Sequence, residues 1–317
     1  MGTGVNRLWE TAMGLFQFGR QETARPASGT LAAFLRGYSI EVMPRTLAAL
    51  PDFRTLLPRG TRVYIAHLDG TEIADMIGAA ARLRTWGFEP MPHIPARSIP
   101  DRAAFADLLA RYRGEAGVRE ALVIAGGRAN PLGEFHSSMQ LLETGLFDRA
   151  GFTRLHVAGH PEGSRDIDPD GSDRLVAEAL AWKQAFSERT DAAMGIVTQF
   201  AFEAAPVIAW ADRLRAEGIA LPIHLGVAGP AKLQTLVKFA VACGVGPSLK
   251  VLQRRARDVS KLVLPFTPDA FLTDLAAAAA RRPGDFPIAG VHFFPLGGIA
   301  TNAAWLAERG LAPTPEN

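Results

Sequence analysis

The sequence predicts an α/β protein in which eight parallel strands close into a (β/α)8 TIM barrel. Short apolar runs rich in Val, Ile, Leu and Phe recur along the chain, and longer amphipathic segments separate them. Alternating strands and helices indicate parallel strands joined by right-handed crossovers. Eight such units favour a closed barrel, because closure removes both edge strands. An open doubly wound sheet is the alternative, which the lack of a G-x-G-x-x-G motif after the first strand disfavours.

The elements follow in a regular order. The predicted strands lie at 38–44, 62–68, 89–94, 121–126, 154–159, 195–200, 222–227 and 290–296. The clearest helical segments between them lie at 71–86, 101–113, 172–190 and 203–217. The stretch 230–289 is too long for one crossover helix, so we expect two or three helices there. We expect an N-terminal helical extension at 1–30, a single barrel domain at 31–311 and a loose tail at 312–317.

Length and composition restrict the class of protein. The 317 residues are 48% hydrophobic and 21% charged, which is typical of a globular protein. The chain has 34 basic and 32 acidic residues, which is nearly balanced. We therefore expect no nucleic-acid partner, although residues 254–261 form a local basic cluster. No apolar run reaches the roughly 18 residues of a membrane span, and no signal pattern opens the chain, so we expect no membrane partner and a cytoplasmic location. The single cysteine, Cys243, permits no intrachain disulfide.

Polar residues gather where the predicted strands end, which is where active sites of such barrels lie. Glu41 lies on the first strand and Gln199 on the sixth, and a carboxylate or amide within an apolar strand is costly unless it is hydrogen-bonded or functional. A structural interpretation stays open for both: Glu41 could pair with a buried Arg or Lys, and Gln199 could be a satisfied core amide. His67 and Asp69 follow the second strand, and His93 ends the third.

Two loops after strands have the composition of ligand-binding loops. The sequence GGRANP at 126–131 allows close approach of backbone to a ligand. The sequence GHPEGS at 159–164 precedes an acidic turn, where we expect Ser172 or Asp173 to cap the next helix. Seven histidines raise the possibility of a metal site. A metal-dependent hydrolase barrel would have two histidines near the end of the first strand, which has none, so we expect no catalytic metal.

Taken together, these segments resemble the methylenetetrahydrofolate reductase family over residues 35–310, of which the chain is identified as a divergent member. The most specific segments are the glutamate-bearing first strand ending at Pro44, and Pro92 followed by His93. Three longer segments complete the resemblance: VAGHPEG at 157–163, the stretch from IVTQF to HLGV at 196–227, and HFFPL at 292–296. The order of these segments at successive strand ends is more specific than any one of them.

The resemblance implies an FAD-dependent oxidoreductase of one-carbon metabolism and methionine biosynthesis. Such a flavoprotein interconverts 5,10-methylenetetrahydrofolate and 5-methyltetrahydrofolate by hydride transfer at flavin N5. The resemblance implies that Glu41 is the general acid that helps to open the imidazolidine ring of the tetrahydrofolate derivative. NAD(P)H is a candidate electron donor, and the resemblance also implies a homo-oligomer.

The resemblance further implies binding residues. The substrate positions match Gln199, Phe239, Phe294 and Arg128. The cofactor positions match Tyr64, His93, Gly126, Gly127, Arg128, Phe135, His136, Ser137, His160 and Ser164, with Glu178 and Lys183 as candidates, because an insertion precedes Gln199. His160 stands where family members commonly have a tyrosine, and Ser164 where they commonly have a histidine.

The main departure from the family is Arg128, which stands where the family has an aspartate beside the flavin. An arginine there reverses the local charge, which predicts a higher flavin potential and favours oxidation of 5-methyltetrahydrofolate. Two other functions stay open. One is a tetrahydrofolate-dependent methyl-transfer or demethylation protein without flavin chemistry, and the other is a non-catalytic folate-binding paralogue.

Overall fold

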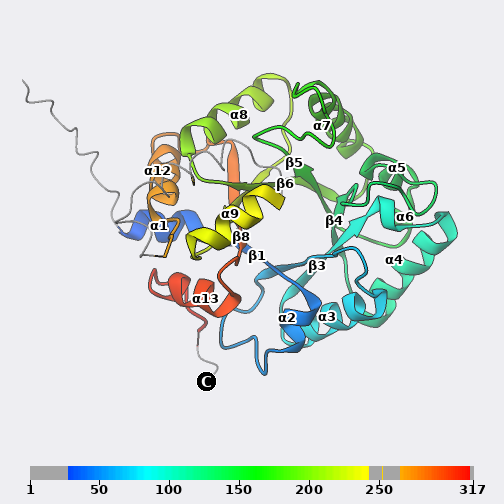
Figure 1. Cartoon of the computed structure of the whole chain (residues 1–317), viewed down its shortest axis with the longest axis horizontal. Helices are drawn as coiled ribbons and strands as arrows, with labels where there is room; N and C mark the ends of the chain where they lie inside the picture. The colour runs from blue at the N-terminus through cyan, green and yellow to red at the C-terminus, as the bar shows by residue number, and fades with distance from the viewer. Residues whose placement is uncertain (1–27, 243–251, 253–264, 315–317) are drawn as a thin grey trace, which may run out of the picture.

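The computed structural model describes residues 28–242, 252 and 265–314 of the chain. Eight parallel strands form a closed barrel in the order of the sequence, so the predicted fold class is confirmed. The barrel closes between the first and last strands, where Ser39 lies opposite His292. Figure 1 shows the strands as a ring with helices around it. None of the helices in the described ranges is long and apolar enough to cross a bilayer.

The strands are β1 (Ser39–Val42), β2 (Arg62–Ile65), β3 (Glu89–Pro95), β4 (Glu120–Ile124), β5 (Arg154–Gly159), β6 (Ala193–Ala201), β7 (Ile223–Ala228) and β8 (Ile288–Phe294). The helices are α1 (Ser28–Leu35), α2 (Pro44–Ala48), α3 (Ile73–Thr85), α4 (Arg102–Ala116), α5 (Ser138–Glu143), α6 (Leu146–Arg149), α7 (Arg174–Ser187), α8 (Ala204–Ala216), α9 (Leu233–Ala242), α12 (Asp269–Ala280) and α13 (Ile299–Ala307), with a short 3-10 turn at Ala96–Ser98.

Some predicted features lie outside the described residues or end at other positions. Residues 1–27 of the expected extension, Cys243 and the basic cluster at 254–261 belong to the first group. The first strand was expected to end at Pro44, but β1 ends at Val42 and Pro44 begins α2. Proline suits the first turn of a helix, since its fixed φ is helical and its missing N–H is not needed there.

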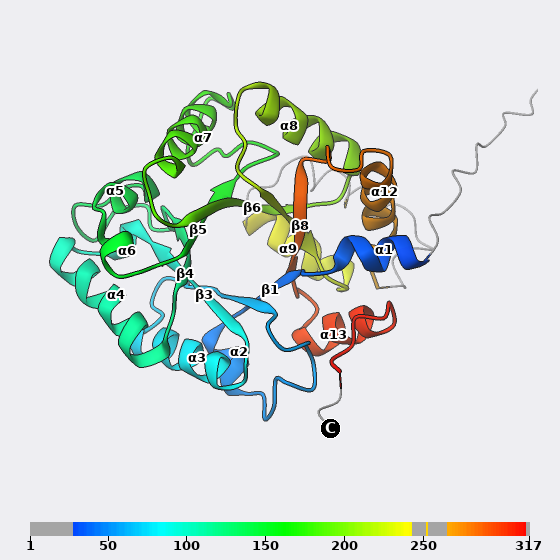
Figure 2. The same ribbon diagram turned by 180° about the vertical axis from the view of Figure 1, so that it is seen from behind.

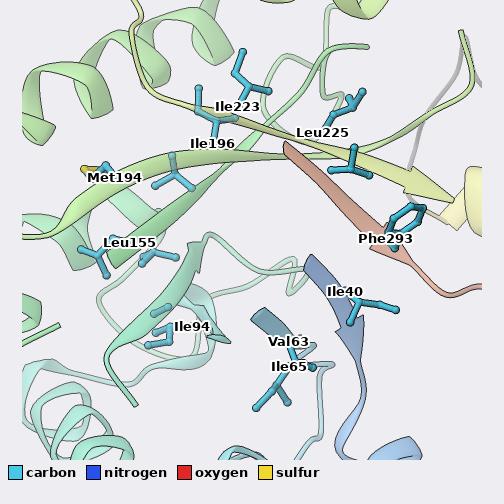
Figure 3. Close-up of a cluster of buried hydrophobic side chains, with 14 of the residues drawn as sticks. Ile40, Val63, Ile65, Ile94, Leu155, Met194, Ile196, Ile223, Leu225 and Phe293 are labelled. Carbon is cyan, nitrogen blue, oxygen red and sulfur yellow. The ribbon is translucent and has the colours of Figure 1, made fainter. Parts of the chain in front are cut away.

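One face of each strand packs against the surrounding helices. Alternate residues such as Ile40, Val63, Leu155 and Phe293 are buried in one large hydrophobic cluster with the helices. Figure 3 shows that strands around the whole ring contribute to this cluster. The helix α1, which Figure 2 shows beside α12, joins the same cluster through Leu35.

The opposite face of each strand fills the interior of the barrel, which is polar at its N-terminal end. The guanidinium of Arg62 donates two hydrogen bonds to Glu120, at 2.5 and 3.1 Å. The Nε of Arg154 donates a third to the same carboxylate at 3.2 Å. These ion pairs close the barrel opposite the predicted site.

Asp173, one of the two predicted capping residues, is the N-cap residue of α7, but its side chain makes no capping hydrogen bond, and Asp168 caps the helix instead. The buried carboxylate of Asp168 accepts hydrogen bonds from the backbone N–H groups of Leu175 and Val176, each at 3.0 Å, and from Ser172 Oγ at 3.1 Å. Burial alone would raise the pKa of Asp168, but these three donors hold that pKa below its usual value. The loop before α7 therefore folds back onto the start of the helix.

Candidate active site

A carboxylate and an imidazole meet at the C-terminal end of the barrel. The Oε2 atom of Glu41 on β1 lies 3.2 Å from Nε2 of His93 on β3. The Glu41 side chain is 22% exposed and that of His93 11%, so both are accessible from the mouth of the barrel. The Nε2 atom of His93 makes no hydrogen bond to the described residues, because the contact with Glu41 has the distance but not the direction of one. Glu41 therefore pairs with a histidine, whereas a purely structural role predicted a buried Arg or Lys as its partner.

Two further side chains lie close to His93. The ring of Tyr64 on β2 contacts His93 edge to face, with centroids 6.3 Å apart. Tyr64 is fully buried and its hydroxyl points toward His156, so it supports the site from inside the barrel and does not line its mouth. Burial, and then the nearby His93, lower the pKa of His67 on the loop after β2. His67 is therefore neutral at physiological pH.

A bulge in β6 positions Gln199. Val197 packs with Tyr64 in the barrel interior, and Phe200 packs with Phe294 above it, so two residues three apart both face inward. Strict alternation forbids this, and the pairing of β6 with β7 indeed shifts between Val197 and Phe200. The hydroxyl of Thr198 provides hydrogen bonds for two backbone groups at the bulge. It donates to Gln199 O at 2.7 Å and accepts from Gly226 N at 2.9 Å. Gln199 is half-buried within this bulge.

Gly226 on β7 is required by the same bulge. A Cβ at this position would lie 2.3 Å from Thr198 O and 2.6 Å from Gln199 O, both backbone atoms. We expect Gly226→Ala to lower the free energy of unfolding by about 1–3 kcal/mol, measured by chemical denaturation, because the bulge must move. Gly78→Ala in α3 is the matched control, since nothing lies within 4 Å of a Cβ there. Equal stability of the two variants would contradict this role for Gly226.

The mouth is partly covered by an apolar cluster under α9. Leu233, Leu236 and Ala240 of α9 pack with Phe200, Phe202 and Phe294. The helix lies over β6 and β8 in Figure 1 and behind them in Figure 2, so it covers one side of the barrel end. Phe239 on the same helix remains 37% exposed. The apolar cluster under α9 therefore lines part of this end of the barrel.

Arg97, which the sequence analysis did not single out, organises the loop after β4. Its guanidinium donates to the carbonyl oxygens of Gly126, Arg128 and His136 at 3.4, 3.2 and 3.1 Å. It also pairs with Asp166 of the loop after β5 at 3.2 Å. The only available signal was its position two residues after the third strand. Arg97 therefore fixes two neighbouring loops of the mouth relative to each other.

The glycines and the arginine of the loop after β4 differ in their surroundings. Gly126 has φ +94°, and a Cβ there would lie 2.7 Å from Pro95 Cβ, so only glycine fits. Gly127 is exposed with open space around it. Arg128 forms an ion pair with Asp69 of the loop after β2, and its buried Nε has no hydrogen-bond partner within the described ranges. Asp69 therefore offsets the charge of Arg128, so the charge at this point is not simply reversed.

The contacts of the segment from Phe135 to Ser137 support the fold and do not involve the mouth residues described above. Phe135 is buried against Phe105, with ring centroids 6.2 Å apart. The Oε1 atom of Gln140 accepts from His136 N at 2.6 Å and from Ser137 N at 3.1 Å, which completes a capping box at the start of α5. His136 is exposed. These contacts give all three residues a structural role.

The loop after β5 and the helix α7 separate the remaining predicted residues. Glu178 is exposed and paired with Arg174 at 2.8 Å, so it does not reach the mouth. Lys183 is 6% exposed, and burial lowers its pKa to about 8. Its amine makes no hydrogen bond or ion pair within the described residues. Burial, and then the charge of Lys183, lower the pKa of His160 to about 4. The half-buried Ser164 ends the loop in a turn, with its carbonyl accepting from Asp168 N at 2.8 Å.

Comparison with known proteins adds little to this geometry. No protein-family model matches the chain. A solved structure of a dehydrogenase/reductase from Sinorhizobium meliloti 1021 is 12% identical and covers 85% of this chain and 98% of its own, with a TM-score of 0.29. A likeness at that level supports no argument about fold or function. The function of this α/β barrel must therefore be argued from its site.

Proposed function

We propose that this protein is an FAD-dependent oxidoreductase that interconverts 5,10-methylenetetrahydrofolate and 5-methyltetrahydrofolate. The observation on which the proposal rests is the carboxylate of Glu41 at the barrel mouth, 3.2 Å from a histidine. Gln199 and Phe294 reach the same end of the barrel from β6 and β8. This arrangement supports a proton donor, an amide and an apolar surface around one flat ligand.

Several side chains fit an anionic, flat cofactor. Lys183 is buried and has no counter-ion among the described residues, and burying a lone cation is costly unless a ligand pairs with it. A cofactor pyrophosphate has the charge to do so. The Nε of Arg128 is likewise buried without a hydrogen bond, and the open backbone at Gly127 permits close approach of a ligand. Lys183, Arg128, Gly127 and His93 would hold FAD, whereas Glu178 would not.

The protein's own residues would orient the substrate and manage its proton. FAD, when bound and reduced by NAD(P)H, would supply the hydride. Glu41 would hold a proton at its carboxyl and release it to the leaving nitrogen as the imidazolidine ring opens. The Nε2 atom of His93 lies 3.2 Å from that carboxyl and would help to position it. The side-chain amide of Gln199 would hydrogen-bond the pterin, and Phe239 with Phe294 would exclude water from its faces.

The visible spectrum of the purified protein tests this proposal. We expect the absorption of an oxidised flavin, and bleaching under anaerobic conditions on addition of NADH, NADPH or 5-methyltetrahydrofolate. The donor that bleaches the flavin identifies the electron partner and the working direction. A colourless protein that binds tetrahydrofolate would contradict the proposal and favour methyl transfer without flavin. Binding of folate and flavin without any reduction would favour a non-catalytic paralogue.

Replacing Lys183 tests the fit of the cofactor. We expect Lys183→Met to weaken FAD binding by roughly ten- to a hundredfold, because a hydrogen bond to a charged group contributes about 1.5–3 kcal/mol. Titration of the apoprotein with FAD, followed by flavin fluorescence, measures this. Arg189→Met, which removes an exposed charge beyond the end of α7, is the control. Equal affinities in both variants would exclude Lys183 from the cofactor site.

If FAD binds beside Arg128, the ion pair between Arg128 and Asp69 should influence the midpoint potential of the flavin. Arg128→Asp should lower the midpoint potential by tens of millivolts, since a cation beside the ring favours the anionic reduced form. Asp69→Asn should raise the potential, because the charge of Arg128 is then no longer offset. Anaerobic titration against a reference dye measures both shifts. The same potential in wild type and Arg128→Asp would show that Arg128 does not act on the flavin.

A further inference from the structure

The barrel interior beneath Glu41 and His93 is filled by polar side chains. Ser39 from β1, Tyr64 from β2, His156 from β5 and His292 from β8 are each at most 1% exposed. We call these four residues the interior network. Barrels of this type usually fill these layers with Val, Ile and Leu.

The interior network consists of two hydrogen-bonded pairs whose rings are in contact. The hydroxyl of Tyr64 lies 2.5 Å from Nδ1 of His156, and Ser39 Oγ lies 2.9 Å from Nδ1 of His292. The two pairs meet where the ring of Tyr64 contacts that of His292, with centroids 4.3 Å apart. Burial strongly lowers the pKa of both histidines and raises that of Tyr64, so all three are neutral at physiological pH. The tautomer of His156 decides which of the two groups donates this hydrogen bond, and the buried Nε2 atom of His156 makes none to the described residues.

Glycines on neighbouring strands make room for the imidazoles. A Cβ at Gly195 would lie 3.0 Å from His156 Nε2. A Cβ at Gly290 would lie 3.1 Å from Nδ1 of His224, whose ring stacks on His156 with centroids 4.6 Å apart. The strands around the histidines are thus adapted to them. Three metal-ligating side chains do not converge anywhere in the described ranges, so these imidazoles form no metal site there.

The interior network contacts the candidate active site from below. The ring of Tyr64 lies 4.3 Å from that of His292 and contacts His93 edge to face. His292 in turn contacts Phe294 edge to face, at 4.8 Å. Because no hydrogen bond from the described residues fixes Nε2 of His93, the direction of that atom depends on how the ring packs against Tyr64. The Tyr64 ring is itself held by its hydroxyl.

We propose that Tyr64 is a positioning residue, and that the interior network fixes the ring of His93 and, through it, the carboxyl of Glu41. An aliphatic layer would avoid the cost of burying these polar groups, but it would not fix the plane of the ring beneath His93. The proposal deepens the proposed function, because its kinetic test depends on that reaction. The structural test described below does not.

The kinetic test is Tyr64→Phe, which removes the hydroxyl and keeps the ring. We expect kcat to fall by about ten- to a hundredfold, as for a small misplacement of a reacting group, with KM and flavin content unchanged. Tyr112→Phe is the matched control, since Tyr112 is also fully buried but lies on α4. Equal kcat values in the two variants would overturn the proposal. A parallel loss of flavin or of folate affinity in Tyr64→Phe would also overturn it.

The structural test uses NMR of protein labelled with 15N-histidine and requires no turnover. We expect the ring nitrogens of His93 to shift in Tyr64→Phe and in Ser39→Ala, but not in Tyr112→Phe. His93 signals unchanged in the first two variants would overturn the proposal even if the protein is a reductase. Shifted signals in a protein without reductase activity would support the positioning role and reject only the proposed reaction. For an active enzyme, the kcat losses of the two single variants should be less than additive in the double variant, and strict additivity would overturn the network.

Discussion

Glu41→Gln is expected to reduce turnover by about 10²–10⁴-fold, the usual contribution of a general acid. Glutamine keeps the size and hydrogen-bonding capacity of the side chain but has no proton to release at the leaving nitrogen. Flavin content and folate affinity should therefore stay near the wild-type values. Steady-state kinetics with 5,10-methylenetetrahydrofolate and the donor identified by anaerobic reduction measures the loss.

Two further variants sharpen this test. Glu143→Gln changes an exposed carboxyl on α5 and should leave kcat unchanged. Glu41→Asp keeps the acid but shortens its reach from β1, so it should retain part of the rate. Wild-type turnover in Glu41→Gln would remove this residue from its proposed role. Equal losses in Glu41→Gln and Glu143→Gln would point to a general effect on the fold.

Lowering the pH from 7 to 4 is expected to remove most of the folding stability. Burial lowers the pKa of His160 and of His224 to about 4, and lowers that of His156 and His292 even more strongly. Below pH 6.5 the unfolded chain therefore binds protons that the folded chain excludes, so stability is lost as the pH falls. A shift from 6.5 to about 4 corresponds to about 3 kcal/mol for each group. Denaturant unfolding followed by circular dichroism at pH 7, 5.5 and 4 measures the decline.

A histidine variant isolates the cause of this decline. His224→Gln removes one buried group that excludes a proton, so the stability of this variant should depend less steeply on pH between 6.5 and 4. His136→Gln is the control, because His136 is exposed on the loop before α5. The same pH dependence in both variants would show that the buried imidazoles do not cause the acid sensitivity. Constant stability from pH 7 to pH 4 would contradict the prediction as a whole.

The strands were predictable because each is a short apolar run whose periodicity depends only on local residues. Their ends were less predictable, since they depend on contacts with other segments. Pro44 starts a helix where the sequence suggested the end of a strand. The bulge at Thr198 and Gln199 required the hydroxyl of Thr198 and the absence of a Cβ at Gly226, which lies on another strand.

The candidate site was predictable at its centre. Glu41 and His93 stand on different strands, and strand ends of a parallel barrel meet at one face, so the order of the motifs brought them together. The periphery was not predictable. Glu178 and Lys183 lie on the same helix, five residues apart. Glu178 is exposed in an ion pair, whereas Lys183 is buried and has no ion-pair partner in the part of the chain that the structure describes. Arg128 acquires a partner from the loop after β2, which moderates the charge reversal that the sequence implied.

The sequence by itself determined the (β/α)8 class and the strand ends at which the polar side chains gather, because both follow from local periodicity and from one topological rule. Only the tertiary structure decided which polar side chains share the interior. Ser39 and His292 are 253 positions apart, yet closure of β1 against β8 brings them within hydrogen-bonding distance. Hydrogen bonds and burial depend on the distances between side chains in space, and no pattern along the chain encodes those distances.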